Sequence, residues 1–122
     1  MKIRIEDNSV RLRLRKSEVS QLAGEGFLSA TTVFPEQHFE YGLQADPGIS
    51  DMEASFAQGK ITVRLPRPWI QTWPDSPKVG FETTFKIGAD SLHILVEKDF
   101  VCLDRDPETQ KDQFANPKQG KV

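Results

Sequence analysis

The sequence predicts a mainly β protein of the α+β class, with about eight antiparallel strands in a closed or nearly closed barrel-like meander and two short helices. Apolar and polar residues alternate with a period of two along most of the first 103 residues, as half-buried strands require. Turn-forming residues divide this alternation into hairpins. An even number of strands lets the first and last strands pair antiparallel and close the sheet. A two-sheet β-sandwich is the alternative.

The first hairpin covers 2–15 and turns at Asp7 and Asn8, two residues that tolerate the positive φ of a tight turn. This turn sets Arg4 opposite Arg11. The cations of both strands then share one face, and the aliphatic side chains share the other, because side chains alternate along a strand.

A short helix is predicted next. Ser17 is a favourable N-cap, apolar residues recur after it at helical spacing, and Gly24 is placed to end the helix. The second hairpin covers 27–34 and 38–45, with a proline-containing turn between its strands.

The third hairpin covers 52–65. Its turn at Gln58 and Gly59 sets Glu53 opposite Arg64, which is a cross-strand pair of opposite charges on the polar face. This pairing leaves the apolar side chains of both strands together on the other face.

The last hairpin follows a second short helix. Pro68 opens that helix, because proline is favoured at a first helical position. The hairpin itself covers 79–87 and 92–102. Closure of the meander would then place residues 2–6 beside residues 93–102.

The domain organisation follows from where the alternation stops. Residues 1–103 are expected to form a single antiparallel β domain, and 104–122 a polar C-terminal tail. The sequence shows no internal repeat.

Composition describes a small soluble protein. The chain has 122 residues, 28% of them charged, and a net charge of −2, which suits one domain. No apolar run is long enough to span a bilayer, so no membrane partner is expected. Cys102 is the only cysteine. A single cysteine excludes an internal disulfide and fits a reducing, cytoplasmic location. We expect its side chain to be a buried thiol in the core.

Charge is distributed unevenly along the chain. Residues 1–16 carry six Lys and Arg against two acidic residues, whereas 17–103 carry twelve Asp and Glu against six Lys and Arg. The acidic body gives the basic hairpin an internal partner. This distribution argues against nucleic acid as a partner, because nucleic-acid-binding domains are usually basic overall.

The two ends of the chain carry a resemblance to a known family. They contain K-I-R-I at 2–5, N-S-V-R at 8–11 and S-E-V at 17–19, then E-K-D-F at 97–100, C-L-D at 102–104 and an N-P at 116–117. In these motifs the chain resembles a family of small uncharacterised bacterial proteins, and the resemblance covers most of its length. No activity is assigned to that family, so the resemblance implies no catalytic residue.

The basic face of the first hairpin has two interpretations. Arg4, Arg11, Arg13 and Arg15 could grip a phosphorylated small molecule or another polyanion, because the planar guanidinium bonds phosphate in a bidentate way. They could instead form a ladder of ion pairs with the carboxylates of the acidic body. The balance of charge favours the ladder.

The last strand carries a second candidate cluster. His93, Glu97 and Asp99 share one strand face, where they could act as the acidic partners of the basic hairpin or bind a cation. Residues two apart on a strand always share a face, so this spacing is weak evidence for a cation site. Pairing with the basic hairpin is therefore the favoured interpretation. The sequence contains no catalytic motif, no zinc spacing and no cofactor-binding motif.

Three functions therefore remain open. The first is a binding or accessory module without catalytic activity. The second is a small enzyme or binder that takes a phosphorylated or polyanionic ligand on the arginine-rich hairpin. The third is a structural, homo-oligomeric protein that buries this hairpin at an interface. An enclosed arginine face would favour the second function, and a fully paired one would favour the first.

Overall fold

The computed structural model describes residues 1–100 and 112–115, so Cys102 lies outside the described residues. The chain divides into two units. Unit 1 contains residues 1–17 together with the described residues from 79 onward, and unit 2 contains residues 18–78. Each unit is built on its own four-stranded sheet.

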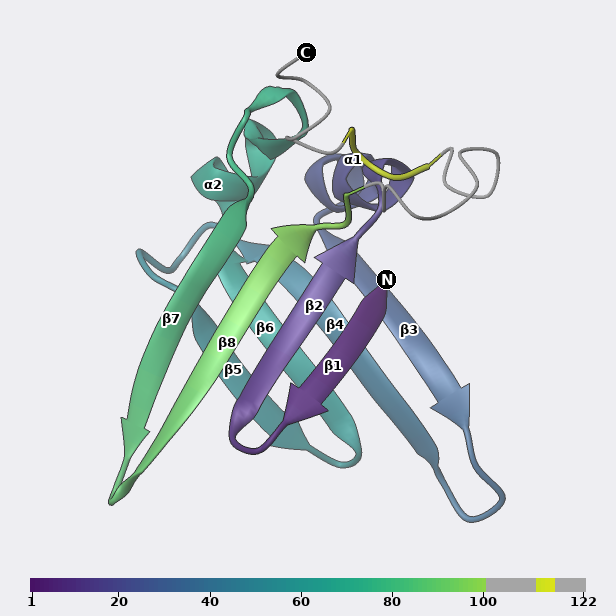
Figure 1. Ribbon diagram of the computed structural model, residues 1–122, viewed down its shortest axis with the longest axis vertical. Helices are drawn as coiled ribbons and strands as arrows, with labels where there is room; N and C mark the ends of the chain where they lie inside the picture. Colours follow the sequence, from purple (N-terminus) through teal and green to yellow (C-terminus); the bar gives the residue numbers. More distant parts are fainter. Residues whose placement is uncertain (101–111, 116–122) are drawn as a thin grey trace. The chain divides into compact units, whose positions relative to one another are not determined.

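The sheet of unit 1 has the strand order β1-β2-β8-β7 (Figure 1). Its strands are β1 (Lys2–Glu6), β2 (Ser9–Leu14), β7 (Gly80–Ile87) and β8 (Asp90–Lys98). β1 with β2, and β7 with β8, are antiparallel hairpins, whereas β2 and β8 pair in parallel. The predicted register of the first hairpin, with Arg4 opposite Arg11, is confirmed.

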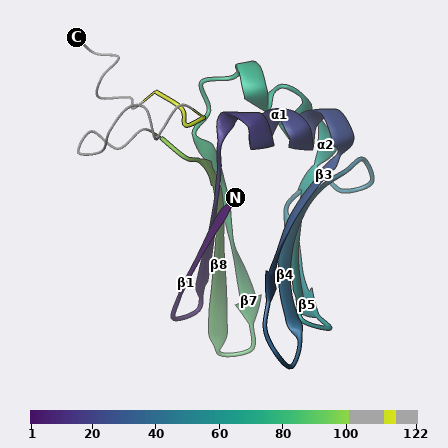
Figure 2. The same cartoon turned by 90° about the vertical axis from the view of Figure 1, so that its right-hand side faces the viewer.

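The sheet of unit 2 has the order β3-β4-β6-β5. Its strands are β3 (Phe27–Val33), β4 (His38–Asp46), β5 (Glu53–Ala57) and β6 (Lys60–Pro66). β4 and β6 pair in parallel, and both hairpins are antiparallel. Glu53 stands opposite Arg64, as predicted. Figure 2 views this sheet from its β3 side.

The mainly β prediction is confirmed, but the antiparallel closed meander is wrong. Among the described residues the strands form two separate sheets, each with parallel and antiparallel pairs. The division into two sheets agrees with the two-sheet alternative. The strand beside β8 is β2, and not the predicted β1. β2 buries three aliphatic side chains and β8 buries two, whereas Ile5 of β1 is 56% exposed. The two most apolar strands therefore take the central positions, and β1 is left at an edge.

The two units repeat one strand pattern. In each unit, two hairpins are joined through parallel pairing of their second strands, β2 with β8 and β4 with β6. A backbone hydrogen bond joins the two hairpins beside each parallel pair, but its donor lies in the second hairpin in unit 1 and in the first hairpin in unit 2. The N–H of His93 donates to the carbonyl of Asn8 at 3.1 Å, and the N–H of Glu40 donates to that of Gly59 at 2.9 Å. A repeat of backbone pairing leaves no necessary trace in side chains, which is why the sequence does not show it.

The short helices differ from prediction at their ends. α1 (Lys16–Glu25) carries the chain from unit 1 into unit 2 and ends beyond the predicted Gly24. Gly26 follows it with φ of 85°, and its N–H donates to the carbonyl of Leu22. The left-handed residue that ends a helix is usually glycine, and here the second of two glycines takes that position.

The second helix is α2 (Arg67–Gln71), followed by a 3₁₀ turn at Trp73–Asp75. Proline lies in the first turn of both. α2 packs on β4 and β6 within unit 2. Trp73 is fully buried, and its indole N–H donates to the carbonyl of Lys78 at 2.9 Å. No helix among the described residues is long and apolar enough to cross a membrane.

Burial in each sheet is concentrated on one face. In unit 1 the buried aliphatic side chains of the central strands are Val10, Leu12, Leu14, Ile94 and Val96. In unit 2 the corresponding central residues are Tyr41, Leu43, Val63 and Leu65. The opposite face of the unit 1 sheet carries the charged residues that the sequence singles out.

Candidate functional site

The arginine side chains of the first hairpin lie on one face of the unit 1 sheet because they alternate with buried residues. In β2 the sequence S-V-R-L-R-L gives strict alternation of half-exposed and buried positions. The parallel register sets Arg13 opposite Glu97 of β8. The same register sets Ser9 opposite His93. The cations of β1 and β2 therefore lie on the same face of the sheet as His93 and Glu97 of β8.

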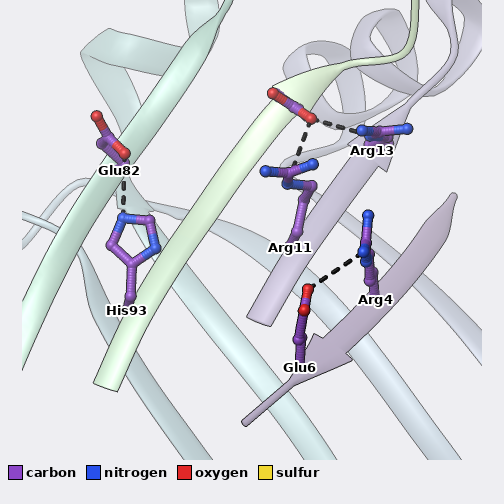
Figure 3. Close-up of polar contacts among 7 residues, drawn as sticks. Arg4, Glu6, Arg11, Arg13, Glu82 and His93 are labelled. Carbon is purple, nitrogen blue, oxygen red and sulfur yellow. Dashed lines mark hydrogen bonds and ion pairs between the residues drawn. The ribbon is translucent and has the colours of Figure 1, made fainter. Parts of the chain in front are cut away.

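Glu97 is the shared acceptor of two of these cations. The Nε atom of Arg13 donates to its Oε1 at 2.9 Å, and the Nε atom of Arg11 lies 3.7 Å from the same oxygen. Figure 3 shows Arg11 and Arg13 converging on this carboxylate from β2. The Glu97 side chain is only 18% exposed, so the contacts are partly shielded from solvent. A single carboxylate thus serves two guanidinium groups and offsets half of their combined charge.

The remaining arginines also have carboxylate neighbours. Arg4 binds Glu6 of its own strand at 3.1 Å, a pair that is well exposed (Figure 3). Arg15 lies 3.6 Å from Asp112. Each of the four predicted anion-binding arginines therefore has an acidic residue within 4 Å. Arg11 and Arg13 pair with Glu97 of β8, as the ladder interpretation expects, whereas Arg4 pairs within its own strand.

Asp99 is the most buried acidic group of the ladder, with 4% of the residue exposed. It accepts from Lys2 Nζ at 3.0 Å and from Gln113 Nε2 at 2.9 Å. Burial alone would raise the pKa of Asp99, but the Gln113 hydrogen bond, the Lys2 contact and the nearby Arg13 together hold it below the ordinary value. The carboxylate is therefore a structural anion at neutral pH.

His93 is held apart from the acidic pair with which it was predicted to act. Its Nε2 lies 3.1 Å from Oε2 of Glu82 on β7 (Figure 3). Its antiparallel neighbour on β7 is Thr84. Among the residues that the structure describes, no three His, Cys, Asp or Glu side chains gather closely enough to hold a metal ion. The three members of the candidate cluster thus have partners on different strands: β7 for His93, β2 for Glu97 and β1 for Asp99.

Asp112 takes the capping position that the sequence assigned to Ser17. Its Oδ1 accepts from the backbone N–H of Ser17 at 2.9 Å, and its Oδ2 accepts from the Ser17 hydroxyl. The Ser17 hydroxyl hydrogen bond lowers the pKa of Asp112, against the raising effect of desolvation, and Arg15 and Lys16 add to the lowering. A carboxylate at the first turn of α1 also complements the helix dipole. This contact joins residues far apart in the sequence, so local pattern could not predict it.

Sequence reasoning missed a pocket in unit 2. It has a volume of about 460 Å³ and lies at the ends of the β3–β4 and β5–β6 hairpins. Its lining residues are Phe34, Glu36, Gln37, His38, Phe39, Phe56 and Gly59. The available signal was the placement of phenylalanines beside turns, where apolar residues are poorly covered by the sheet.

We expect Glu97→Gln to lower the free energy of unfolding by about 1–2 kcal/mol, between the values typical of exposed and buried ion pairs. The reason is that one substitution leaves two half-buried arginines without their shared charge. Urea unfolding measures the loss. The matched control is Glu82→Gln, whose side chain is 65% exposed, and it should cost less than about 0.5 kcal/mol. Equal losses for the two variants would contradict the shielded ladder.

No curated protein and no solved structure matches the chain. A family model described as "Family of unknown function (DUF7009)" matches residues 1–118, which include both hairpins of unit 1, all of unit 2 and the segment that carries Asp112. The chain therefore belongs to this family of unknown function.

Proposed function

We propose that the protein is a binding module that accepts an apolar side chain of a partner in the aromatic pocket of unit 2. The pocket itself is the observation that carries this proposal. Its volume of about 460 Å³ falls in the range of about 300–1,000 Å³ typical of binding pockets. The proposal ascribes no catalytic step to the described residues.

The exposure of the pocket walls supports this function. Phe34 is 52% exposed and Phe56 is 69% exposed, although both are large aromatic residues. Leaving such side chains in water forgoes part of the hydrophobic stabilisation that burial gives. Aromatic side chains in a pocket are also the residues that most often dominate the binding energy of interfaces. A partner that buries these side chains gains the hydrophobic stabilisation that folding of the chain alone does not provide.

The polar groups of the pocket limit the ligand. Glu36, Gln37 and His38 line it beside three phenylalanines. A mainly apolar site with a few polar groups orients an amphipathic group such as an indole better than a fully charged one. We therefore take a tryptophan-like side chain as the occupant and free indole as its probe.

The arginine face supports the anion-binding alternative less well. An anion would have to compete with Glu97 for Arg11 and Arg13, and with Glu6 for Arg4. Glu97 is covalently part of the same sheet, so its effective concentration beside both guanidinium groups is high. Anion binding by this face would require the ladder to open.

Titration of the ¹⁵N-labelled protein with indole, and separately with tripolyphosphate, tests the proposed function. Indole should give saturable amide shifts at residues 34, 36–39, 56 and 59, and Phe56→Ser should weaken this binding by about tenfold, as expected for loss of an aromatic contact. The control is Ile87→Ser at the β7 end in unit 1, a side chain that is 55% exposed and outside the pocket. It should bind indole like the wild type.

Two outcomes of the same titrations would overturn the proposal. The first is the absence of saturable indole shifts at the pocket. The second is saturable tripolyphosphate binding, at fixed ionic strength, with shifts centred on Arg11 and Arg13. That second result would instead assign the function to the arginine face.

A further inference from the structure

The edge strand β3 differs from the other sheet edges that the structure describes. The two sheets leave β1, β7, β3 and β5 at their edges. β1 contains Lys2, β7 contains Lys86, and β5 begins at Glu53 and has five residues. β3 has the sequence F-L-S-A-T-T-V, which is seven residues long and contains no charge and no proline. Charged residues, proline and short length are the usual features by which proteins prevent an edge strand from pairing with a strand of another chain.

The free edge of β3 presents a regular set of backbone groups. In the β3–β4 hairpin, Phe34 N–H donates to Gln37, and beyond the other end of β3 the N–H of Ala45 donates to Gly26. Opposite residues in an antiparallel pair alternate between bonded and non-bonded positions. The even-numbered residues of β3 therefore bond to β4. The N–H and C=O groups of the odd-numbered residues point away from the sheet, and all four of those residues are exposed: Phe27, Ser29, Thr31 and Val33.

This edge is complementary to itself. When two β3 strands run antiparallel about Ala30, Phe27 stands opposite Val33 of the second copy. Ser29 then stands opposite Thr31, a type of hydroxyl pair that is favourable across strands. Phe27 is 59% exposed and Val33 is 70% exposed, so the pairing covers two apolar side chains at each end. The odd-numbered residues face each other in this register, as their outward backbone groups require.

We propose that β3 is a self-association edge that pairs antiparallel with β3 of a second copy of this chain. The pairing joins two four-stranded sheets into one continuous sheet with two-fold symmetry. Each facing pair of odd-numbered residues exchanges two backbone hydrogen bonds, giving about eight in all. The proposal does not depend on the aromatic pocket.

The residues that flank β3 limit the strength of this dimer. The strand lies between Glu25 and Glu36, so each end of the pairing brings carboxylates of the two copies near one another. Like charges oppose association and are screened by salt. We therefore expect a dimer in the micromolar range that tightens as ionic strength rises.

Sedimentation velocity of the full chain, from about 5 to 500 μM, tests the proposal across the micromolar affinity range. The wild type should move from monomer to dimer with concentration. The double variant Ser29→Lys with Thr31→Lys opposes like charges in both central pairs and should weaken the dimer by about tenfold or more. The same positions changed to Glu should weaken it similarly. A mixture of the two double variants should regain the dimer, because opposite charges then face each other.

A matched control and a folding check accompany these variants. Ser55→Lys places a lysine on the other edge strand of the same sheet and should leave the dimer unchanged. Melting temperatures near that of the wild type show that the variants fold, since all substituted side chains are exposed. A wild type that stays monomeric throughout the concentration range would overturn the proposal. Failure of the mixed variants to regain the dimer, or loss of the dimer in Ser55→Lys, would also overturn it.

Discussion

Asp99→Ala should lower the free energy of unfolding by about 3 kcal/mol, the scale of losing one partner of a buried, charge-assisted contact. Asp99 is 4% exposed, and its loss leaves Gln113 Nε2 without its acceptor and Lys2 without its counter-charge. Asp99→Asn keeps the shape and an acceptor oxygen, so it should lose about half as much. Chemical denaturation at neutral pH measures both losses.

The pH dependence of this loss has a definite sign. The folded-state pKa of Asp99 lies below its ordinary value of 3.8. A lowered pKa means that the charged group stabilises the fold fully above the unfolded-state pKa of about 3.9, and that this stabilisation disappears as pH falls through the folded-state pKa. The difference in stability between wild type and Asp99→Asn should therefore be constant from neutral pH to about pH 5 and shrink below about pH 4.

Asp90→Asn is the control for removing one acidic charge. Asp90 is the exposed first residue of β8, directly after the β7–β8 turn, so its substitution should change stability by less than about 0.5 kcal/mol. A difference between wild type and Asp99→Asn that grew toward acid would contradict the lowered pKa. A loss for Asp99→Ala no greater than that for Asp90→Asn would contradict its burial.

Gly80→Ala should cost about 3 kcal/mol or more, because the added methyl group collides with backbone rather than with a movable side chain. A Cβ atom at Gly80 would lie 2.2 Å from the carbonyl oxygen of Val96 and 2.8 Å from the Cα of Glu97. The collision falls on the β7–β8 pairing, where Gly80 stands opposite Glu97. The midpoint of urea unfolding should fall accordingly.

Gly24→Ala is the matched substitution without a collision. Gly24 lies inside α1, and nothing would lie within 4 Å of an added Cβ atom. Alanine favours a helix over glycine by about 0.5–1 kcal/mol, so this variant should be more stable than the wild type. A Gly80→Ala variant as stable as the wild type would show that β7 and β8 separate locally to admit the methyl group.

The hairpins could be predicted from the sequence because they depend on local pattern. The turns at Asp7 and Gln58 fix the register of both strands on either side, and the structure gives these two residues φ values of 50° and 52°. The alternation S-V-R-L-R-L likewise fixes which side chains share a face, since the side-chain period is two. Nothing distant is needed for either inference.

The parallel pairings could not be predicted, because they depend on choices between distant strands. The predicted closure and the observed sheet both give β8 a partner from the first hairpin, and local alternation is the same in β1 and β2. Relative burial decides the choice, and burial is a property of the whole fold. The Ser17–Asp112 cap and the aromatic pocket depend in the same way on segments that only folding brings together.

The pairing of β2 with β8 also sets the order in which a growing chain can fold. All strands of unit 2 lie in one continuous stretch of chain. In unit 1, by contrast, β2 cannot pair with β8 until β8 has been synthesised, since Leu12 stands opposite Val96. Until then, β2 has an uncovered aliphatic face and one open edge, while all the residues of unit 2 have already been synthesised. Transiently exposed strand edges of this kind favour aggregation. When a ribosome pauses before β8, the first hairpin has therefore been synthesised, but it cannot yet be incorporated into its four-stranded sheet.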